Sequence, residues 1–219
     1  MDNPHRYIAV EGPIGVGKTS LARRIADSFG CELLLEEAEE NPFLSRFYED
    51  PRSAALQTQL YFLMQRVRQM QELCQAELFH PVRVADFLME KDRLFAESTL
   101  DEDELRLYEQ ISSHLAPEVP APDLVIYLQA PAEVLMKRIN QRGRPYERQI
   151  DMAYLQRLSE AYTRLFHNYA AAPILIVNAA EIDLVNSEQD YQQLLQQVCE
   201  TRSGRHYFNP LPLELQRGA

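Results

Sequence analysis

A glycine-rich run followed by a lysine and a threonine lies near the start of the chain. Residues 12–19 read GPIGVGKT and fit the pattern GxxxxGK[ST] without a mismatch. In such a loop the glycines let backbone N–H groups converge on phosphate oxygens, while the lysine reaches the β- and γ-phosphates and the hydroxyl binds Mg²⁺. Lys18 is therefore a candidate catalytic residue and Thr19 a candidate magnesium ligand. The predicted ATP and phosphate site comprises Gly12, Pro13, Ile14, Gly15, Val16, Gly17, Lys18, Thr19 and Ser20.

The surrounding sequence favours a small-molecule kinase among the classes that use this loop. A GTPase would carry a base-reading NKxD, which does not occur, and the DxxG at 27–30 closes a predicted helix instead of a strand. A motor-type ATPase would have an apolar strand that ends in Asp and usually Glu, whereas here Asp86 is followed by Phe87. A kinase of small molecules is the class that remains.

Glu36 is the first candidate for acid–base chemistry. It follows Leu33, Leu34 and Leu35, and so should lie where the second predicted strand ends. Ligands of open α/β sheets bind at that edge, and a carboxylate there could accept the proton of an attacking hydroxyl. The glutamates at 37, 39 and 40 are expected in a solvated turn.

Five short apolar runs predict the strands that must position these residues. They lie at Arg6–Glu11, Cys31–Leu35, Val82–Ala85, Leu124–Leu128 and Ile174–Val177. Segments with helical spacing separate them, including a long one over 53–79 and two over 87–115 with a break near 99–103. Strands separated by helices imply right-handed crossovers and a parallel sheet covered on both faces.

We therefore expect an α/β fold of three layers, with a five-stranded parallel sheet, in a single domain over residues 1–219. Residues 117–122, with three prolines, should form a rigid connector, and the tail over 201–219 shows no regular pattern.

Composition limits the partners and the compartment. The net charge of −11 disfavours nucleic acid, because an acidic chain repels a phosphate backbone. No stretch approaches the roughly 20 apolar residues of a membrane span. The first residues lack the layout of a signal peptide, and three cysteines without CxxC spacing are typical of reduced thiols. We expect a cytoplasmic protein that binds neither nucleic acid nor membranes.

Beyond these local patterns, the order of motifs resembles the deoxynucleoside kinase family, especially its bacterial deoxyadenosine/deoxyguanosine kinase branch. The matching segments are EGPIGVGKTS at 11–20, EEAEENPFLSRFYEDP at 36–51, QLYFLMQR at 59–66, ADFLMEKDRLFAE at 85–97 and RINQRGRPYE at 138–147. Many enzymes share the phosphate loop, whereas ENPFL…FY and RGRP are far more discriminating. The resemblance implies a P-loop kinase fold and ATP- and Mg²⁺-dependent phosphorylation of a deoxynucleoside 5′-hydroxyl in nucleotide salvage.

The resemblance also implies roles for individual residues. Glu36 becomes the general base, Tyr48 and Glu147 contact the sugar 3′-hydroxyl, and Gln59 reads the base. An arginine-rich lid over about 142–150, together with the preceding helix, places Arg138, Arg142 and Arg144 over the phosphates. From the residues alone, Tyr48 could equally be an ordinary tyrosine of an amphipathic helix, Gln59 a surface residue, and Arg138 and Arg142 solvated neighbours on one helix face.

Asp86 marks a departure from the animal enzymes, which carry a Glu-Arg-Ser triplet where this chain has Ala85-Asp86-Phe87. Depending on whether one gap is allowed in the alignment with that triplet, Asp86 replaces either the magnesium-side glutamate or the base-side arginine. On the base side its carboxylate would favour an amino-bearing base such as adenine, and we expect a purine substrate.

Two other functions stay open at this point. A nucleoside monophosphate kinase such as thymidylate kinase would want cations where this chain has four glutamates. A non-catalytic nucleotide-binding regulatory module would bind ATP without turnover. A homodimer is the expected assembly.

Overall fold

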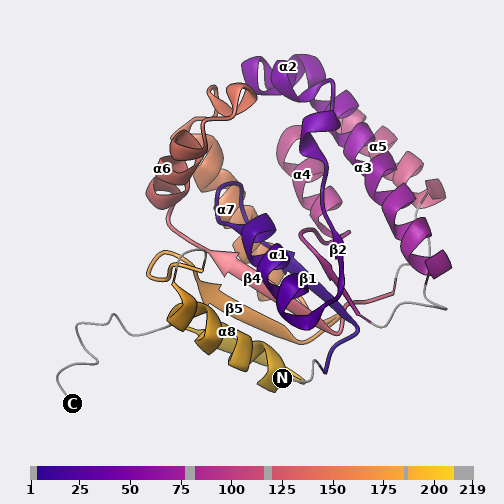
Figure 1. Ribbon diagram of the computed structural model, residues 1–219. Coiled ribbons are helices and arrows are strands. Elements are labelled where there is room, and N and C mark those ends of the chain that lie inside the picture. The colour runs from indigo at the N-terminus through magenta and orange to yellow at the C-terminus, as the bar shows by residue number, and fades with distance from the viewer. Residues whose placement is uncertain (1–3, 77–81, 116–119, 185–186, 210–219) are drawn as a thin grey trace.

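Six parallel strands form the centre of the computed structural model, which describes residues 4–76, 82–115, 120–184 and 187–209, without the side chains of 72–76 (Figure 1). The strands are β1 (Tyr7–Glu11), β2 (Glu32–Leu34), β3 (Arg83–Ala85), β4 (Leu124–Gln129), β5 (Ile174–Asn178) and β6 (Arg205–Phe208). Their order across the sheet is β2-β3-β1-β4-β5-β6, and every neighbouring pair is parallel. The carboxyl ends of all the strands therefore lie at one edge.

Helices connect the strands and cover both faces of the sheet. They are α1 (Lys18–Phe29), η1 (Ala38–Glu40), α2 (Leu44–Glu49), α3 (Pro51–Ala76), α4 (Lys91–Thr99), α5 (Glu102–Leu115), α6 (Ala132–Arg142), η2 (Pro145–Glu147), α7 (Met152–His167) and α8 (Glu188–Glu200). The predicted break between two helices near residues 99–103 is confirmed. No helix among the described residues is long and apolar enough to cross a membrane.

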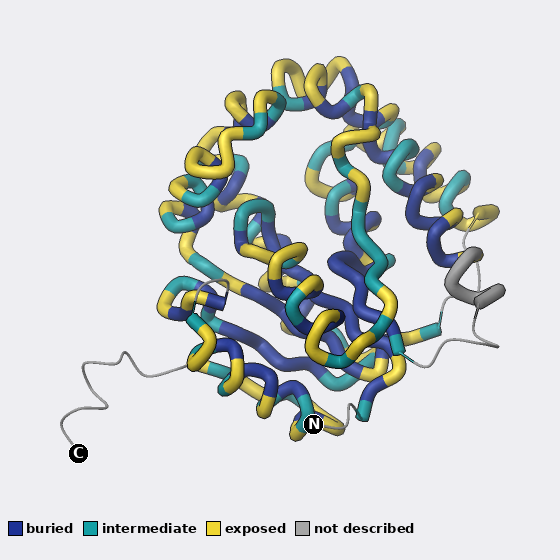
Figure 2. Tube along the Cα trace, viewed as in Figure 1, coloured by how far each residue is buried: buried dark blue, intermediate teal, exposed yellow. Residues whose placement is uncertain are grey.

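Successive residues of β1 show how the core divides into two layers. Ile8 and Val10 pack with α1, α6 and α8 on one face, whereas Tyr7 and Ala9 pack with α4 and α7 on the other. Side chains alternate between the faces of a strand, so burial on both faces requires the uninterrupted apolar runs seen in the sequence. Figure 2 shows the central strands buried and the outer turns of the helices exposed.

The expectation of five strands and an irregular tail is wrong at one place. Arg205–Phe208 forms a sixth strand, with Arg205 opposite Ile174 of β5. This strand has one neighbour in the sheet, and two of its four residues are exposed. An edge strand with the sequence RHYF therefore lacks the apolar run that marked the other five. Residues 210–219 of the tail, 116–119 of the proline-rich region and 77–81 after the long helix lie outside the described residues.

Candidate active site

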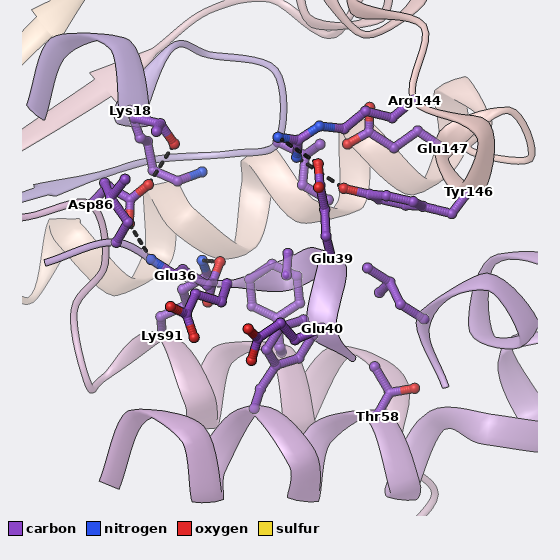
Figure 3. A pocket seen from close by; sticks show the side chains of 18 of the residues that line it. Lys18, Glu36, Glu39, Glu40, Thr58, Asp86, Lys91, Arg144, Tyr146 and Glu147 are labelled. Carbon is purple, nitrogen blue, oxygen red and sulfur yellow. Dashed lines mark hydrogen bonds and ion pairs between the residues drawn. The ribbon is translucent and has the colours of Figure 1, made fainter. Parts of the chain in front are cut away.

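A cavity of about 500 Å³ opens where β1, β2 and β3 end. Its walls are the phosphate loop, the segment 35–40 after β2, helices α2 and α3, the start of α4, and the lid around η2. Its volume lies within the range of about 300–1,000 Å³ typical of small-molecule sites. Figure 3 shows side chains from these separate segments pointing into one space.

Two glycines shape the phosphate loop between β1 and α1. A Cβ at Gly12, where φ is +148°, would lie 2.3 Å from the carbonyl oxygen of Leu128. A Cβ at Gly15, where φ is +83°, would lie 2.8 Å from Cγ1 of Ile139. Both positions therefore require glycine for conformation and for space. Lys18 folds back over this loop, and its Nζ donates to the carbonyl of Gly12 at 2.8 Å.

A buried carboxylate that was not predicted as a site residue holds the phosphate loop in place. Glu11, the last residue of β1, accepts hydrogen bonds from the backbone N–H of Gly12 at 2.8 Å and of Leu88 at 2.9 Å. The hydroxyl of Tyr162 donates to it as well, at 2.9 Å. The sequence did contain a signal for this role. A glutamate that ends a strand buried on both faces must itself be buried, and a buried carboxylate needs hydrogen-bond donors around it.

Asp86 connects the phosphate loop to the segment that carries Glu36. The Thr19 hydroxyl donates to Asp86 Oδ2 at 2.5 Å, and the backbone N–H of Glu36 donates to Oδ1 at 2.7 Å. This position beside Thr19 is the one expected for the magnesium-side placement of Asp86. A hydroxyl and a carboxylate are oxygen ligands that suit Mg²⁺.

Glu36 lies between two cations. Arg66 of α3 donates to its Oε1. Lys91, at the start of α4, donates to its Oε2 at 2.8 Å (Figure 3). Arg66 also pairs with Asp92. Burial by itself would raise the pKa of Glu36, but the charges of Arg66 and Lys91 outweigh it and hold that pKa well below its usual range. The carboxylate is therefore ionised at neutral pH, so it can accept a hydrogen bond from a hydroxyl.

Helix α3 also fixes the backbone on both sides of Glu36. Gln69 Nε2 donates to the carbonyl of Leu35 at 2.8 Å, and Gln65 Nε2 donates to that of Glu37 at 3.3 Å. These glutamines, like Arg66 and Lys91, were not predicted as site residues. For Lys91 the residue type itself was a signal, because the chain has three lysines and two of them, Lys18 and Lys91, line this cavity.

The three residues expected to contact the nucleoside line the same cavity as Glu36. The Tyr48 ring stacks on Tyr146, with ring centres 6.4 Å apart, and burial raises the pKa of Tyr48, so its hydroxyl stays protonated and can donate. Glu147 accepts hydrogen bonds from Arg142 at 2.6 and 3.2 Å. Gln59 is buried, so it is not the surface residue that remained an alternative, and its Nε2 donates to the Thr99 hydroxyl at 3.3 Å.

The arginines expected in the lid fall into two groups. Arg142 and Arg144 line the cavity, and Arg144 bridges it, with Nη1 2.9 Å from the Tyr146 hydroxyl and Nη2 3.2 Å from Glu39 Oε1 (Figure 3). Arg138 is not part of this wall. It donates to the carbonyls of Val16 at 3.2 Å and of Ala179 at 2.7 Å.

Arg138 instead lies beside a second cavity of about 720 Å³. This cavity touches the phosphate loop at Gly15, Val16 and Gly17 and lies between α6 and the segment that follows β5. The contacts of Arg138 join that segment to the loop.

Comparison with known proteins gives one consistent result. A family model described as deoxynucleoside kinase matches residues 8–202. The deoxyguanosine kinase of Bacillus subtilis is 33% identical over 204 residues, which cover 90% of this chain and 98% of that protein. The deoxyadenosine/deoxycytidine kinase of the same organism is 29% identical over 200 residues, covering 88% and 91%.

Solved structures agree with this result. A structure of deoxyadenosine kinase from M. mycoides with products bound superposes with a TM-score of 0.76 at 25% identity, covering 88% of this chain and 98% of that one. The same kinase with bound dATP gives a TM-score of 0.77 at 24% identity, covering 89% and 99%.

Proposed function

The chain belongs to the deoxynucleoside kinase family, and we propose that it transfers the γ-phosphate of ATP to the 5′-hydroxyl of a purine deoxynucleoside. The observation that carries this proposal is Glu36, an ionised and largely buried carboxylate that shares one cavity with Lys18 of the phosphate loop. That arrangement offers a proton acceptor for a hydroxyl next to a binding site for phosphates. Membership of a kinase family favours phosphoryl transfer over a regulatory module without turnover.

In the proposed reaction Glu36 accepts the hydrogen bond of the 5′-hydroxyl and takes its proton as the oxygen attacks phosphorus. Lys18 and the lid residues Arg142 and Arg144 stabilise the negative charge on the transferring group. Thr19 and Asp86 would hold Mg²⁺, which supplies further neutralisation of phosphate charge when bound. Closure of the cavity by the lid would exclude water, which otherwise competes as the acceptor.

The cavity beside Arg138 is suited to the nucleoside half of ATP. It touches Gly15, Gly17 and Ser20 and is not lined by Glu36, so a triphosphate lying along the loop would place its nucleoside there. Arg138 then acts on the shape of the donor site by joining the loop to Ala179.

Charge near Glu36 favours an acceptor without a phosphate group. The carboxylate of Glu36 lies close in sequence to the exposed glutamates at 37, 39 and 40, which add negative charge to the rim of the same cavity. A nucleoside monophosphate would have to bring its own dianion into this field. A neutral nucleoside suits the site better than the acceptor of a thymidylate kinase-like enzyme.

Deoxyguanosine or deoxyadenosine should have a higher kcat/KM than thymidine. Gln59 carries this expectation, since its Nε2 is held by Thr99 and its carbonyl oxygen can accept from an exocyclic amine; relatives named deoxyguanosine kinase and deoxyadenosine kinase support it. The measurement is a phosphorylation assay over the four deoxynucleosides with ATP and Mg²⁺. The matched variant Gln59→Leu should lose most of the discrimination. A clear preference for thymidine would overturn the purine assignment.

ATP binding should take up a proton around pH 8. Burial, followed by repulsion from Lys91, lowers the pKa of Lys18 to about 8 in the free protein, and bound phosphates should raise it again. Lys18 is then partly neutral before binding and charged afterwards, so ATP affinity should fall as the pH rises through 8. Calorimetry in buffers of different ionisation enthalpy between pH 7 and 9 measures the uptake.

The control for this experiment is Lys18→Arg, because a guanidinium stays charged throughout this range. Protons taken up or released by ATP itself contribute equally to the titrations of the wild type and of the variant, so they cancel in the comparison. Equal uptake by the wild type and the variant would show that Lys18 is not the titrating group.

A further inference from the structure

The Lys91 ammonium lies in the wall of the cavity, facing the phosphate loop. Lys91 is the first residue of α4, its side chain is 5% exposed, and it lines the cavity together with Lys18 and Thr19. Its Nζ also lies 5.6 Å from the centre of the Phe95 ring. In Figure 3 the side chains of Lys18 and Lys91 reach toward the same space from different elements. A buried ammonium in this position needs an anionic partner.

Glu36 is one partner, but Glu36 is fixed without it. Arg66 holds the other carboxylate oxygen and is itself paired with Asp92. The backbone of Glu36 is held by Asp86, and the carbonyls on either side of it are held by α3. These contacts orient the carboxylate without Lys91, so Lys91 is available for a second task.

The hydrogen-bonding capacity of Lys91 points to a ligand. An ammonium has three N–H donors, and within the described part of the chain its hydrogen-bond partner is Glu36 alone. Because Lys91 lines the cavity, a ligand bound there can reach the remaining donors. A group with several acceptor oxygens would satisfy them.

Electrostatics identify the charge of that group. Lys91 and Lys18 line the same cavity, and their like charges repel each other. An anion between the two ammonium groups would relieve this repulsion. In the proposed reaction one anion has to pass between a phosphate chain on Lys18 and a hydroxyl on Glu36, and that anion is the transferring phosphoryl group.

We propose that Lys91 is a catalytic residue whose ammonium binds an oxygen of the transferring phosphoryl group while it also holds Glu36. The bond from the 5′-oxygen to phosphorus forms as the bond from phosphorus to the ADP oxygen breaks, and the hydroxyl proton passes to Glu36. Lys91 keeps its proton throughout and, with Lys18, stabilises charge at the transferring group. The inference rests on the proposed function and adds to it a residue that contacts the reacting atoms.

The first test replaces the charge and keeps a donor. Lys91→Gln should lower kcat by roughly 10- to 100-fold and change the nucleoside Kd, measured without ATP, by less than about threefold, because the lost contact forms in the transition state. Lys91→Arg should recover most of kcat. Lys137→Gln, which changes an exposed lysine on α6, is the control and should match the wild type.

A double-mutant cycle separates direct contact from positioning. If Lys91 contacts the phosphoryl group, Lys91→Gln should still lower kcat at least fivefold in a Glu36→Gln background. If Lys91 merely orients Glu36, its effect should vanish there, and the proposal is overturned. A kcat of Lys91→Gln within threefold of the wild type would overturn it as well.

Binding of a transition-state mimic gives a readout independent of turnover. With Mg²⁺ and deoxyguanosine present, Lys91→Gln should weaken the affinity for ADP with aluminium fluoride at least tenfold and leave the affinity for ADP alone unchanged. Equal affinities for the mimic would contradict the proposal. A wild-type chain without turnover on any deoxynucleoside would count against the proposed function, whereas an active wild type with an equally active Lys91→Gln variant would count against Lys91 alone.

Discussion

Glu36→Gln should lower kcat by roughly 10²–10⁴-fold while nucleoside binding is largely kept. Glutamine has nearly the same volume and can still accept a hydrogen bond from the 5′-hydroxyl through its amide oxygen. It cannot take the proton, so the loss should appear in the chemical step. Steady-state kinetics with ATP and the preferred deoxynucleoside give kcat, and calorimetry without ATP gives the nucleoside Kd.

Glu37→Gln is the matched control. Glu37 follows directly in sequence and lines the same cavity, but its side chain is exposed, and no hydrogen bond or ion pair of its carboxylate is described. Its variant should stay within a few-fold of the wild type. Similar losses in the two variants would mean that Glu36 is not the proton acceptor.

Arg66→Met should destabilise the fold by about 3–5 kcal/mol, the usual cost of removing one partner from a buried ion pair. The Arg66 side chain is 2% exposed, and its removal leaves the carboxylates of Glu36 and Asp92 without their shared cation. Chemical denaturation at pH 7 measures the free energy of unfolding. Arg68→Met, on an exposed face of the same helix, is the control and should change it by less than about 0.5 kcal/mol.

The destabilisation caused by Arg66→Met should change with pH in a defined direction. In the wild type the pKa of Glu36 is held below its unfolded value, so its contribution to stability is present above pH 4.5 and is lost as the pH falls below that value. Without Arg66 that contribution shrinks, and a buried unpaired carboxylate takes up a proton more readily. The difference in the free energy of unfolding between the variant and the wild type should therefore be smaller at pH 5 than at pH 7. The double variant Arg66→Met/Asp92→Leu should recover part of the stability, and no recovery would mean that the unpaired charge of Asp92 is not the cause.

The sequence predicted those parts of the fold whose signal is local. Five strands followed from apolar runs, because a strand buried on both faces has no polar alternation to obscure it. The phosphate loop followed from a motif in which each residue type has its own physical reason. The strand at Arg205–Phe208 did not follow, since its partner is β5, some 30 residues earlier, and its exposed residues carry no periodic signal.

The acceptor side of the cavity was only partly predictable for a similar reason. Glu36 could be placed from its position at the end of a strand, but its charge state depends on Arg66 and Lys91, which lie 30 and 55 residues away in sequence. Spacing along one helix does not reveal such contacts. Asp86 illustrates the same limit, because the sequence left two placements open and its hydrogen bond with Thr19 is visible in the structure alone.

Helix α3 carries both Gln59 and Arg66, and their separation along the helix has an evolutionary consequence. Gln59 and Arg66 are seven residues apart, about two turns or roughly 10 Å along the axis. In the proposed function the first contacts the base, while the second holds Glu36. Selection for a new nucleoside can therefore act on the turn around Gln59 without disturbing the chemistry two turns later. We expect laboratory evolution toward other bases to collect substitutions near residues 55–62 and to spare Gln65, Arg66 and Gln69, which hold the segment around Glu36 in place.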